Sequence, residues 1–231
     1  MANYLIVESG NDQYFIEALV KQINASIDHI KPIYIDEYEP LQGLDHQKLK
    51  NALGSLKATA QGGKVDRVGI ILDLDQETED NRLQLVNQCL AAVFEAKTEL
   101  TKTCEFIHLE QEPVESSIDI ACYFTQVQGA GELETLLRTI KTKDSPYADC
   151  LQAWRECLAT QGKPIRDKEF DKLWVAQYIR WDTCTRKERK QAKDYCSMAA
   201  FKYVMEHKTH IWDWNHAALD GLKQFLQLFS E

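Results

Sequence analysis

The chain has 231 residues, of which 44% are hydrophobic and 27% are charged, a balance typical of one large globular domain or of a core with an extension. Its formal net charge of −9 argues against binding nucleic acid alone through a broad basic surface, because neutralisation of phosphates drives such binding. The apolar runs, such as 68–72 and 118–124, are far shorter than the roughly 20 residues of a membrane span, and the N-terminus lacks a signal-peptide pattern. We therefore expect a soluble, cytoplasmic protein.

The first 140 residues alternate between strand and helix patterns. Strands are predicted at 3–7, 33–35, 65–72, 104–109 and 118–127. Helices are predicted at 12–23, capped by Asn11 or Asp12, at 45–60, at 79–96 and around 133–140. Such alternation predicts right-handed crossovers and an α/β fold with a mostly parallel sheet flanked by helices.

The remainder of the chain shows helix patterns only. These cover 146–160, 167–181, 186–206 and a short final helix over 217–229, whose apolar residues keep helical spacing and should dock on the core. We therefore predict a core at 1–142 and an all-helical C-terminal extension at 143–231. Trp154, Trp174 and Trp181, at helical positions, are predicted to supply packing area.

The seven cysteines are odd in number and scattered, without a Cys-x-x-Cys pair, so buried free thiols are expected. His207 and His210 could share a helix face near Cys196, but a zinc site would need more ligands at a recognisable spacing. The densest basic segment, 186–193, is interrupted by Glu188. A solvated helix face is favoured there over a DNA-binding patch.

A glutamate follows the first predicted strand. Glu8 precedes Ser9 and Gly10, where the chain can turn sharply because glycine accepts a positive φ. A carboxylate there would face the crevice outside the carboxyl ends of the strands, where ligands collect in open α/β sheets. The alternative is that Glu8 only stabilises the N-terminus of the following helix.

Two aspartates follow the third predicted strand. Alternation along an extended segment puts Asp73 and Asp75 on the same side, with Leu74 turned inward between them. A divalent cation would relieve the repulsion between the two carboxylates, although a solvated strand end that caps the next helix is the alternative. Oxygen-only ligands of this kind suit Mg²⁺ or Mn²⁺.

This arrangement resembles the TOPRIM fold of primases, topoisomerases and overcoming-lysogenization-defect nucleases, which carries a glutamate after its first strand and Asp-x-Asp after its third. The longer pattern from Val7 to Leu19, with Ile211-Trp212 and the apolar tail, looks like a family of small bacterial TOPRIM-related proteins. The core resemblance covers about 1–140. The usual Glu-Gly is Glu8-Ser9 here, and Gly10 stands where a basic residue is often found.

The resemblance implies a role for each matching residue. Glu8 would be the general acid/base or a metal-linked carboxylate, and Asp73 and Asp75 would hold the metal. Glu134 resembles a later acidic position that completes a second site, with an exposed helix glutamate as the alternative. A two-metal reaction would need one further carboxylate. Asp12, Glu77 and Glu134 are the candidates for that carboxylate. The candidate substrate contacts are Ser9, Gly10 and Asp12.

Three functions remain open from the sequence. The first is a metal-dependent nuclease, with nucleic acid as substrate and an ATPase partner that the resemblance implies. The second is a non-catalytic TOPRIM-like protein-interaction module, which the acidic balance favours. The third is a phosphotransfer enzyme for small molecules, although the chain has no glycine-rich phosphate loop of the Walker type.

Overall fold

The structure is a computed structural model that describes residues 2–34, 46–60, 65–111 and 116–230. It divides into two compact units. Unit 1 comprises residues 1–125 and 220–231, and unit 2 comprises residues 126–219. Within the described part of the chain, no helix combines the length and the apolar character needed to cross a membrane.

Unit 1 is built on a five-stranded sheet with the order β2-β1-β3-β5-β4. Its strands are β1 (Asn3–Ser9), β2 (His29–Tyr34), β3 (Arg67–Asp73), β4 (Ile107–Gln111) and β5 (Ser116–Thr125). All neighbours pair in parallel except β4, which runs antiparallel to β5 at the edge. The α/β fold with a mostly parallel sheet is therefore confirmed.

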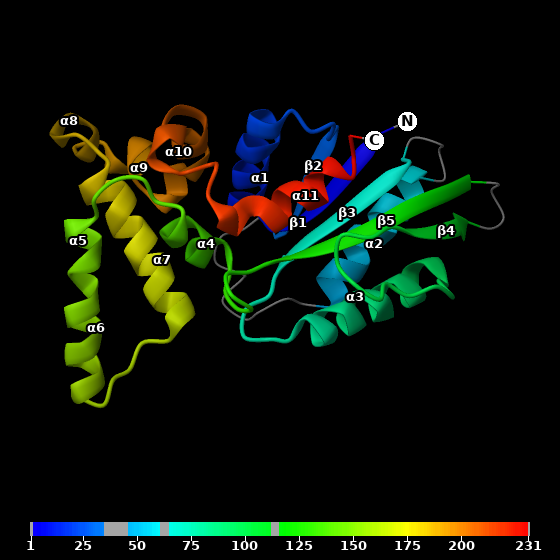
Figure 1. The fold of residues 1–231 in the computed structure, drawn as a ribbon, viewed down its shortest axis with the longest axis horizontal. Helices are drawn as coiled ribbons and strands as arrows, with labels where there is room; N and C mark the ends of the chain where they lie inside the picture. Colours follow the sequence, from blue (N-terminus) through cyan, green and yellow to red (C-terminus); the bar gives the residue numbers. More distant parts are fainter. Residues whose placement is uncertain (1, 35–45, 61–64, 112–115, 231) are drawn as a thin grey trace. The chain divides into compact units, whose positions relative to one another are not determined.

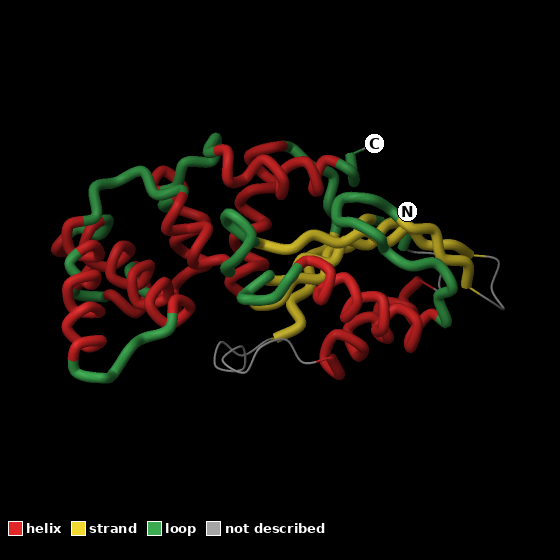
Figure 2. Tube along the Cα trace, turned by 60° about the horizontal axis from the view of Figure 1, so that its bottom comes forward, coloured by secondary structure: helices red, strands yellow, loops and turns green. Residues whose placement is uncertain are grey.

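Helices cover both faces of this sheet (Figure 1). They are α1 (Gly10–Ile23), α2 (His46–Ala60), α3 (Glu79–Phe94) and α11 (Asp220–Gln227). One face packs under α2 and α3 through Ile6, Ile70 and Leu72, whereas α1 and α11 lie on the other. Figure 2 shows the strands as one layer between these helices.

Gly69 explains how closely α11 docks on β3. A Cβ atom at this position would lie 2.4 Å from Leu5 Cδ2, 2.8 Å from Phe229 Cζ and 3.0 Å from Phe225 Cζ. The two phenylalanines are fully buried, because the absence of a side chain at Gly69 lets their rings reach the strand backbone. The C-terminal helix is thus an integral part of unit 1.

Unit 2 is helical, with a core of stacked aromatic rings. Its elements are α4 (Leu133–Thr139), α5 (Pro146–Asp149), α6 (Leu151–Thr160), α7 (Asp167–Gln177), the π-helical turn η2 (Tyr178–Asp182), α8 (Arg186–Arg189), α9 (Ala192–Tyr195), η3 (Met198–Ala200), α10 (Phe201–His207), η4 (Thr209–Ile211) and η5 (Ala217–Leu219). Trp174 stacks on Tyr178 at 5.3 Å between ring centroids, and Tyr178 packs against Trp212 at 5.4 Å. These three side chains are almost completely buried.

Several predictions for unit 2 are wrong. The single helix expected over 186–206 is broken into α8, α9, η3 and α10, because Cys184 and Cys196 form a disulfide that bends this segment. The expectation of buried free thiols at all seven cysteines is wrong for the two in the disulfide. It is also wrong for Cys150 and Cys157, which are free but exposed. Trp174 is buried as predicted, whereas Trp154 and Trp181 are 43% and 40% exposed.

Candidate metal centre

Glu8 lies near the carboxyl end of β1 and is almost completely buried. Its Oε2 accepts a hydrogen bond of 3.2 Å from the backbone N–H of Asp73, the last residue of β3. Because β1 and β3 are parallel neighbours, their carboxyl ends meet at one edge of the sheet. The glutamate therefore ties the ends of the two central strands together.

Asp73 and Asp75 bring their carboxylates to one place. One oxygen of Asp73 lies within 4.8 Å of one oxygen of Asp75. The intervening Leu74 is buried in the hydrophobic core, and its N–H donates to the carbonyl of Thr125 on β5. Asp75 has a φ of 56°, a left-handed conformation that aspartate tolerates better than most residues.

Arg82, on the first turn of α3, is a charged partner that the sequence reading missed. Its Nη2 lies 2.8 Å from Asp75 Oδ2, and the two side chains are only 7% and 17% exposed. Glu8 is bonded to the backbone of Asp73 at the same strand ends, so this edge of the sheet carries three carboxylates beside one guanidinium, and negative charge is in excess when all are ionised. The sequence does contain a signal for this ion pair. Arg82 lies in the first turn of the helix predicted at 79–96, seven residues after Asp75, which brings its cation back toward the end of the strand.

The residues assigned to substrate contact instead form the start of α1. Ser9 is the N-cap, and Ser9 and Asp12 form a capping box in which Asp12 Oδ2 accepts from Ser9 N at 2.9 Å. The sequence predicts Asn11 or Asp12 as the cap, which is two or three residues too late. Gly10 does not adopt a positive φ, so the predicted glycine turn is wrong. Glu77 is exposed and accepts a hydrogen bond from Asn81.

Glu134 and Glu132 lie at the start of α4 in unit 2. Both are buried, Glu134 at 8% and Glu132 at 2% exposure, so Glu134 is not the exposed helix glutamate of the alternative reading. Lys168 and Lys172 on α7 lie 2.9 and 3.8 Å from Glu132 Oε2. Burial, and next the neighbouring Glu134, raise the pKa of Glu132 to about 8, against the two lysines, which lower it. The sequence reading named Glu134 and missed Glu132.

The potential zinc ligands in unit 2 are engaged elsewhere. His207 stacks on Tyr203 at 4.3 Å between ring centroids, and its Nδ1 lies 3.2 Å from the carbonyl oxygen of that residue. Cys196 forms the disulfide with Cys184. Among the described residues, neither His207 nor His210 belongs to a group of three close potential ligands.

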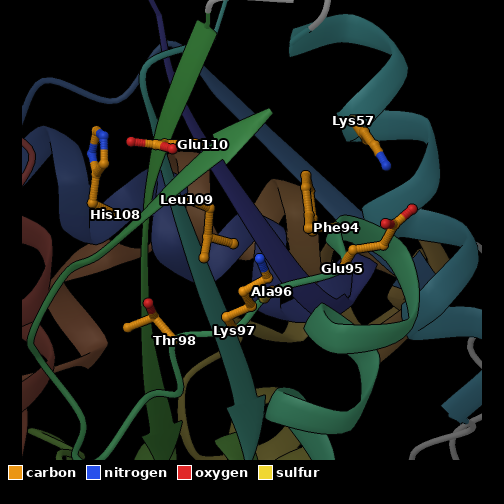
Figure 3. Close-up of a pocket in the computed structure, with 9 residues that line it drawn as sticks. All are labelled: Lys57, Phe94, Glu95, Ala96, Lys97, Thr98, His108, Leu109 and Glu110. Carbon is orange, nitrogen blue, oxygen red and sulfur yellow. The ribbon is translucent and has the colours of Figure 1, made fainter. Parts of the chain in front are cut away.

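A separate cavity of about 380 Å³ lies in unit 1 (Figure 3). It is bounded by Lys57 on α2, by Glu95 and Lys97 after α3, and by His108 and Glu110 on β4. His108 pairs with Asp119, and Asp119 lies beside Arg67 at the beginning of β3. The cavity is therefore at the opposite end of the sheet from Asp73, and its mixed charges do not favour an anion or a cation.

Comparison with known families gives one match. The family model described as "Protein of unknown function (DUF3226)" matches residues 2–231. The chain therefore belongs to the DUF3226 family. No curated protein and no solved structure matched the chain.

Proposed function

We propose that this DUF3226 protein is a metal-dependent, nuclease-like protein that cleaves phosphodiester bonds with Mg²⁺ or Mn²⁺. The observation that carries the proposal is the pair of carboxylate oxygens, from Asp73 and Asp75, within 4.8 Å of each other at the carboxyl end of β3. This is the edge of a parallel sheet where ligands bind. Oxygen ligands in this number suit a hard cation that keeps several waters.

The donor set fits such a cation despite Arg82. The guanidinium contacts Asp75 through Oδ2, and it offsets only part of the negative charge of the three carboxylates. Asp73 and Asp75 would hold the metal, which supplies Lewis-acid stabilisation of a phosphoryl group and lowers the pKa of bound water. Arg82 would keep Asp75 in one rotamer and place a positive charge beside the developing phosphate charge.

Glu8 has two roles in this proposal. By accepting from the backbone N–H of Asp73, it fixes the position from which the Asp73 side chain leaves the strand. Its carboxylate, at the same strand edge, would accept the proton of the attacking water as a general base. The second role is the one that a glutamine in place of Glu8 would lose, because an amide retains an acceptor oxygen but does not take up a proton.

The acidic chain suggests that nucleic acid binding is shared with a partner. The net charge of −9 opposes capture of a polyanion by the whole surface. We include in the proposal an ATPase partner protein that supplies further DNA contacts, as the resemblance to overcoming-lysogenization-defect nucleases implies.

A second candidate function is a non-catalytic interaction module. The ion pair between Arg82 and Asp75 favours it, because a carboxylate with a buried guanidinium partner has its charge met without a metal. In that case the carboxylates would only stabilise the strand ends, and the fold would serve as a docking platform.

Cleavage assays separate the two candidates. The protein would be incubated with plasmid, single-stranded DNA and RNA, each with Mn²⁺, with Mg²⁺ or with a chelator, beside Glu8→Gln and the matched control Glu99→Gln. Glu99 is an exposed glutamate in the loop after α3. We expect metal-dependent cleavage that the control retains and that Glu8→Gln lowers by about 100-fold or more. Absence of cleavage of all three substrates, or equal activity of Glu8→Gln, would contradict the nuclease proposal.

A further inference from the structure

Two aromatic rings are exposed side by side in unit 2. Tyr147 on α5 is 59% exposed and Trp181 in η2 is 40% exposed, and their ring centroids are 5.8 Å apart. Large aromatic side chains at this exposure are unusual, because burying them stabilises a fold by more than almost any other residue. The pair therefore marks a surface with a use other than packing.

Cationic side chains surround these rings. The guanidinium carbon of Arg189 lies 5.1 Å from the Trp181 ring, and that of Arg180 lies 5.9 Å from it. The basic–aromatic surface, as we define it, consists of Tyr147, Arg180, Trp181, Arg186, Lys187, Arg189, Lys190 and Lys193. All of these except the half-buried Arg189 are exposed.

Two of the three acids over residues 180–194 are engaged in contacts within unit 2. Asp182 accepts hydrogen bonds from the backbone N–H groups of Tyr147 and Ala148, at 3.1 and 3.0 Å. Glu188 contacts the buried Lys208 at 2.7 Å and accepts from the N–H of Thr185. Over residues 180–194 only one acidic side chain, Asp194, is exposed. The exposed charge over residues 180–194 is therefore mostly positive, on a chain that is acidic overall, although Asp144 and Asp149 near Tyr147 are also exposed.

The same surface is held in place by its own contacts. Arg189 Nη1 donates to the carbonyl oxygens of Trp181 and Cys184, at 3.3 and 2.8 Å. The disulfide between Cys184 and Cys196 closes the segment that carries α8 and α9. Arg189 and the Trp181 ring are thus preorganised, which lowers the entropy that a ligand must remove on binding.

We propose that the basic–aromatic surface binds single-stranded nucleic acid. The lysines and arginines would contact the phosphates, and unpaired bases would stack on Tyr147 and Trp181. A duplex keeps its base faces covered, and an acidic peptide does not need exposed rings, so a single strand fits both features together. The inference rests on the proposed function for its substrate class, but binding does not require the carboxylates of unit 1.

The test measures binding with catalysis switched off. A fluorescently labelled oligothymidylate of about 20 nucleotides would be titrated with the full chain in a chelator at low salt, and fluorescence anisotropy recorded. We expect saturable binding that weakens steeply with added salt. We expect Trp181→Ala to lower the affinity by about tenfold, and Lys187→Glu with Lys190→Glu to lower it by at least as much.

Two matched controls locate the effect. Trp154→Ala replaces another exposed tryptophan, on α6, and Lys163→Glu reverses a charge in the turn between α6 and α7, at the other end of unit 2 from α8 (Figure 1). Both controls should bind like the wild type. If Trp181→Ala does not fold, as judged by circular dichroism, Tyr147→Ala tests the same stacking contact.

Several outcomes would overturn the inference. They are no binding by the wild type at low salt, unchanged binding by both the aromatic and the charge variants, equal losses in the controls, or a duplex bound as tightly as the single strand. Asp73→Asn should bind normally in the chelator. Binding without metal-dependent cleavage would refute the proposed nuclease activity but support the basic–aromatic surface as a binding site. Cleavage without this binding would support the nuclease activity and refute the binding site.

Discussion

The two units place their charged groups in opposite ways. Unit 1 buries Glu8 and Asp73 at the ends of its central strands, next to a single buried arginine. Unit 2 exposes cations and aromatic rings around η2 and α8, where Asp182 and Glu188 are engaged in contacts of their own. Buried carboxylates are stable only with a compensating charge, whereas exposed cations cost almost nothing. On this comparison rest the two proposals, a cation site in unit 1 and a polyanion surface in unit 2.

The strongest way to break this comparison is to remove Arg82. We expect Arg82→Gln to lower the free energy of unfolding by about 3 kcal/mol, because it leaves Asp75 without its guanidinium. Millimolar Mn²⁺ should recover much of that loss, since a bound cation would replace the missing charge. Chemical denaturation with and without Mn²⁺ measures both effects. Loss of stability with no recovery would favour the purely structural role of these carboxylates.

The disulfide in unit 2 offers the next largest effect. Replacing Cys184 and Cys196 with serine opens the closed segment of α8 and α9. We expect the free energy of unfolding to fall by about 2 to 3 kcal/mol, because the unfolded chain gains conformational entropy when the cross-link that closes this loop is removed. Oligothymidylate affinity should fall as well, through loss of preorganisation. Unchanged affinity would show that the disulfide does not shape the basic–aromatic surface.

A substitution at Gly69 tests how closely the C-terminal segment packs on the sheet of unit 1. Gly69→Ala places a methyl group into Leu5, Phe225 and Phe229. We expect a loss of about 1 to 3 kcal/mol in unfolding free energy from this overpacking. The control is Gly54→Ala on α2, where a Cβ meets nothing within 4 Å and helix propensity favours alanine. Equal behaviour of the two variants would contradict the close docking of α11 on β3.

The last effect, the smallest per unit of pH, concerns Glu132. Since its pKa is raised, the folded protein retains this proton over a range where the unfolded chain has lost it. This contribution to stability is therefore full below the ordinary pKa of 4.5 and is lost as the pH rises to about 8. In the wild type, the unfolding free energy should fall as the pH rises through this window. Glu132→Gln should make that slope shallower by at most about 1.4 kcal/mol per pH unit. An unchanged pH profile would mean that Glu132 is ionised throughout.

The sequence predicted the sheet of unit 1 better than the helices of unit 2. The apolar run from Val68 to Leu72 and the alternation of strand and helix patterns are local signals, so the positions of the strands and the burial of β3 could be predicted from them. The order of the strands in the sheet could not. The breaks in unit 2 depend on a disulfide between Cys184 and Cys196, twelve residues apart, which no helical period encodes. The exposure of Trp181 likewise depends on its neighbours in space.

The candidate site was predictable in part for a similar reason. The alternation of an extended strand predicts that Asp73 and Asp75 share a side, and their oxygens do lie within 4.8 Å, although Asp75 is beyond the end of β3 in a left-handed conformation. Glu8 joins them because β1 and β3 are parallel neighbours, which the βα alternation implies. The contact of Arg82 with Asp75 and the capping box of Ser9 and Asp12 are side-chain arrangements that require coordinates.

The central claim is that the strand-end carboxylates of unit 1 bind a divalent cation. Isothermal titration calorimetry with Mn²⁺ tests it without knowledge of the substrate, on the wild type, Asp73→Asn and the control Asp119→Asn, whose carboxylate lies at the other end of the sheet beside His108. The account predicts saturable binding near one site, retained by Asp119→Asn and lost in Asp73→Asn. No heat of binding, or equal binding by all three proteins, would contradict it.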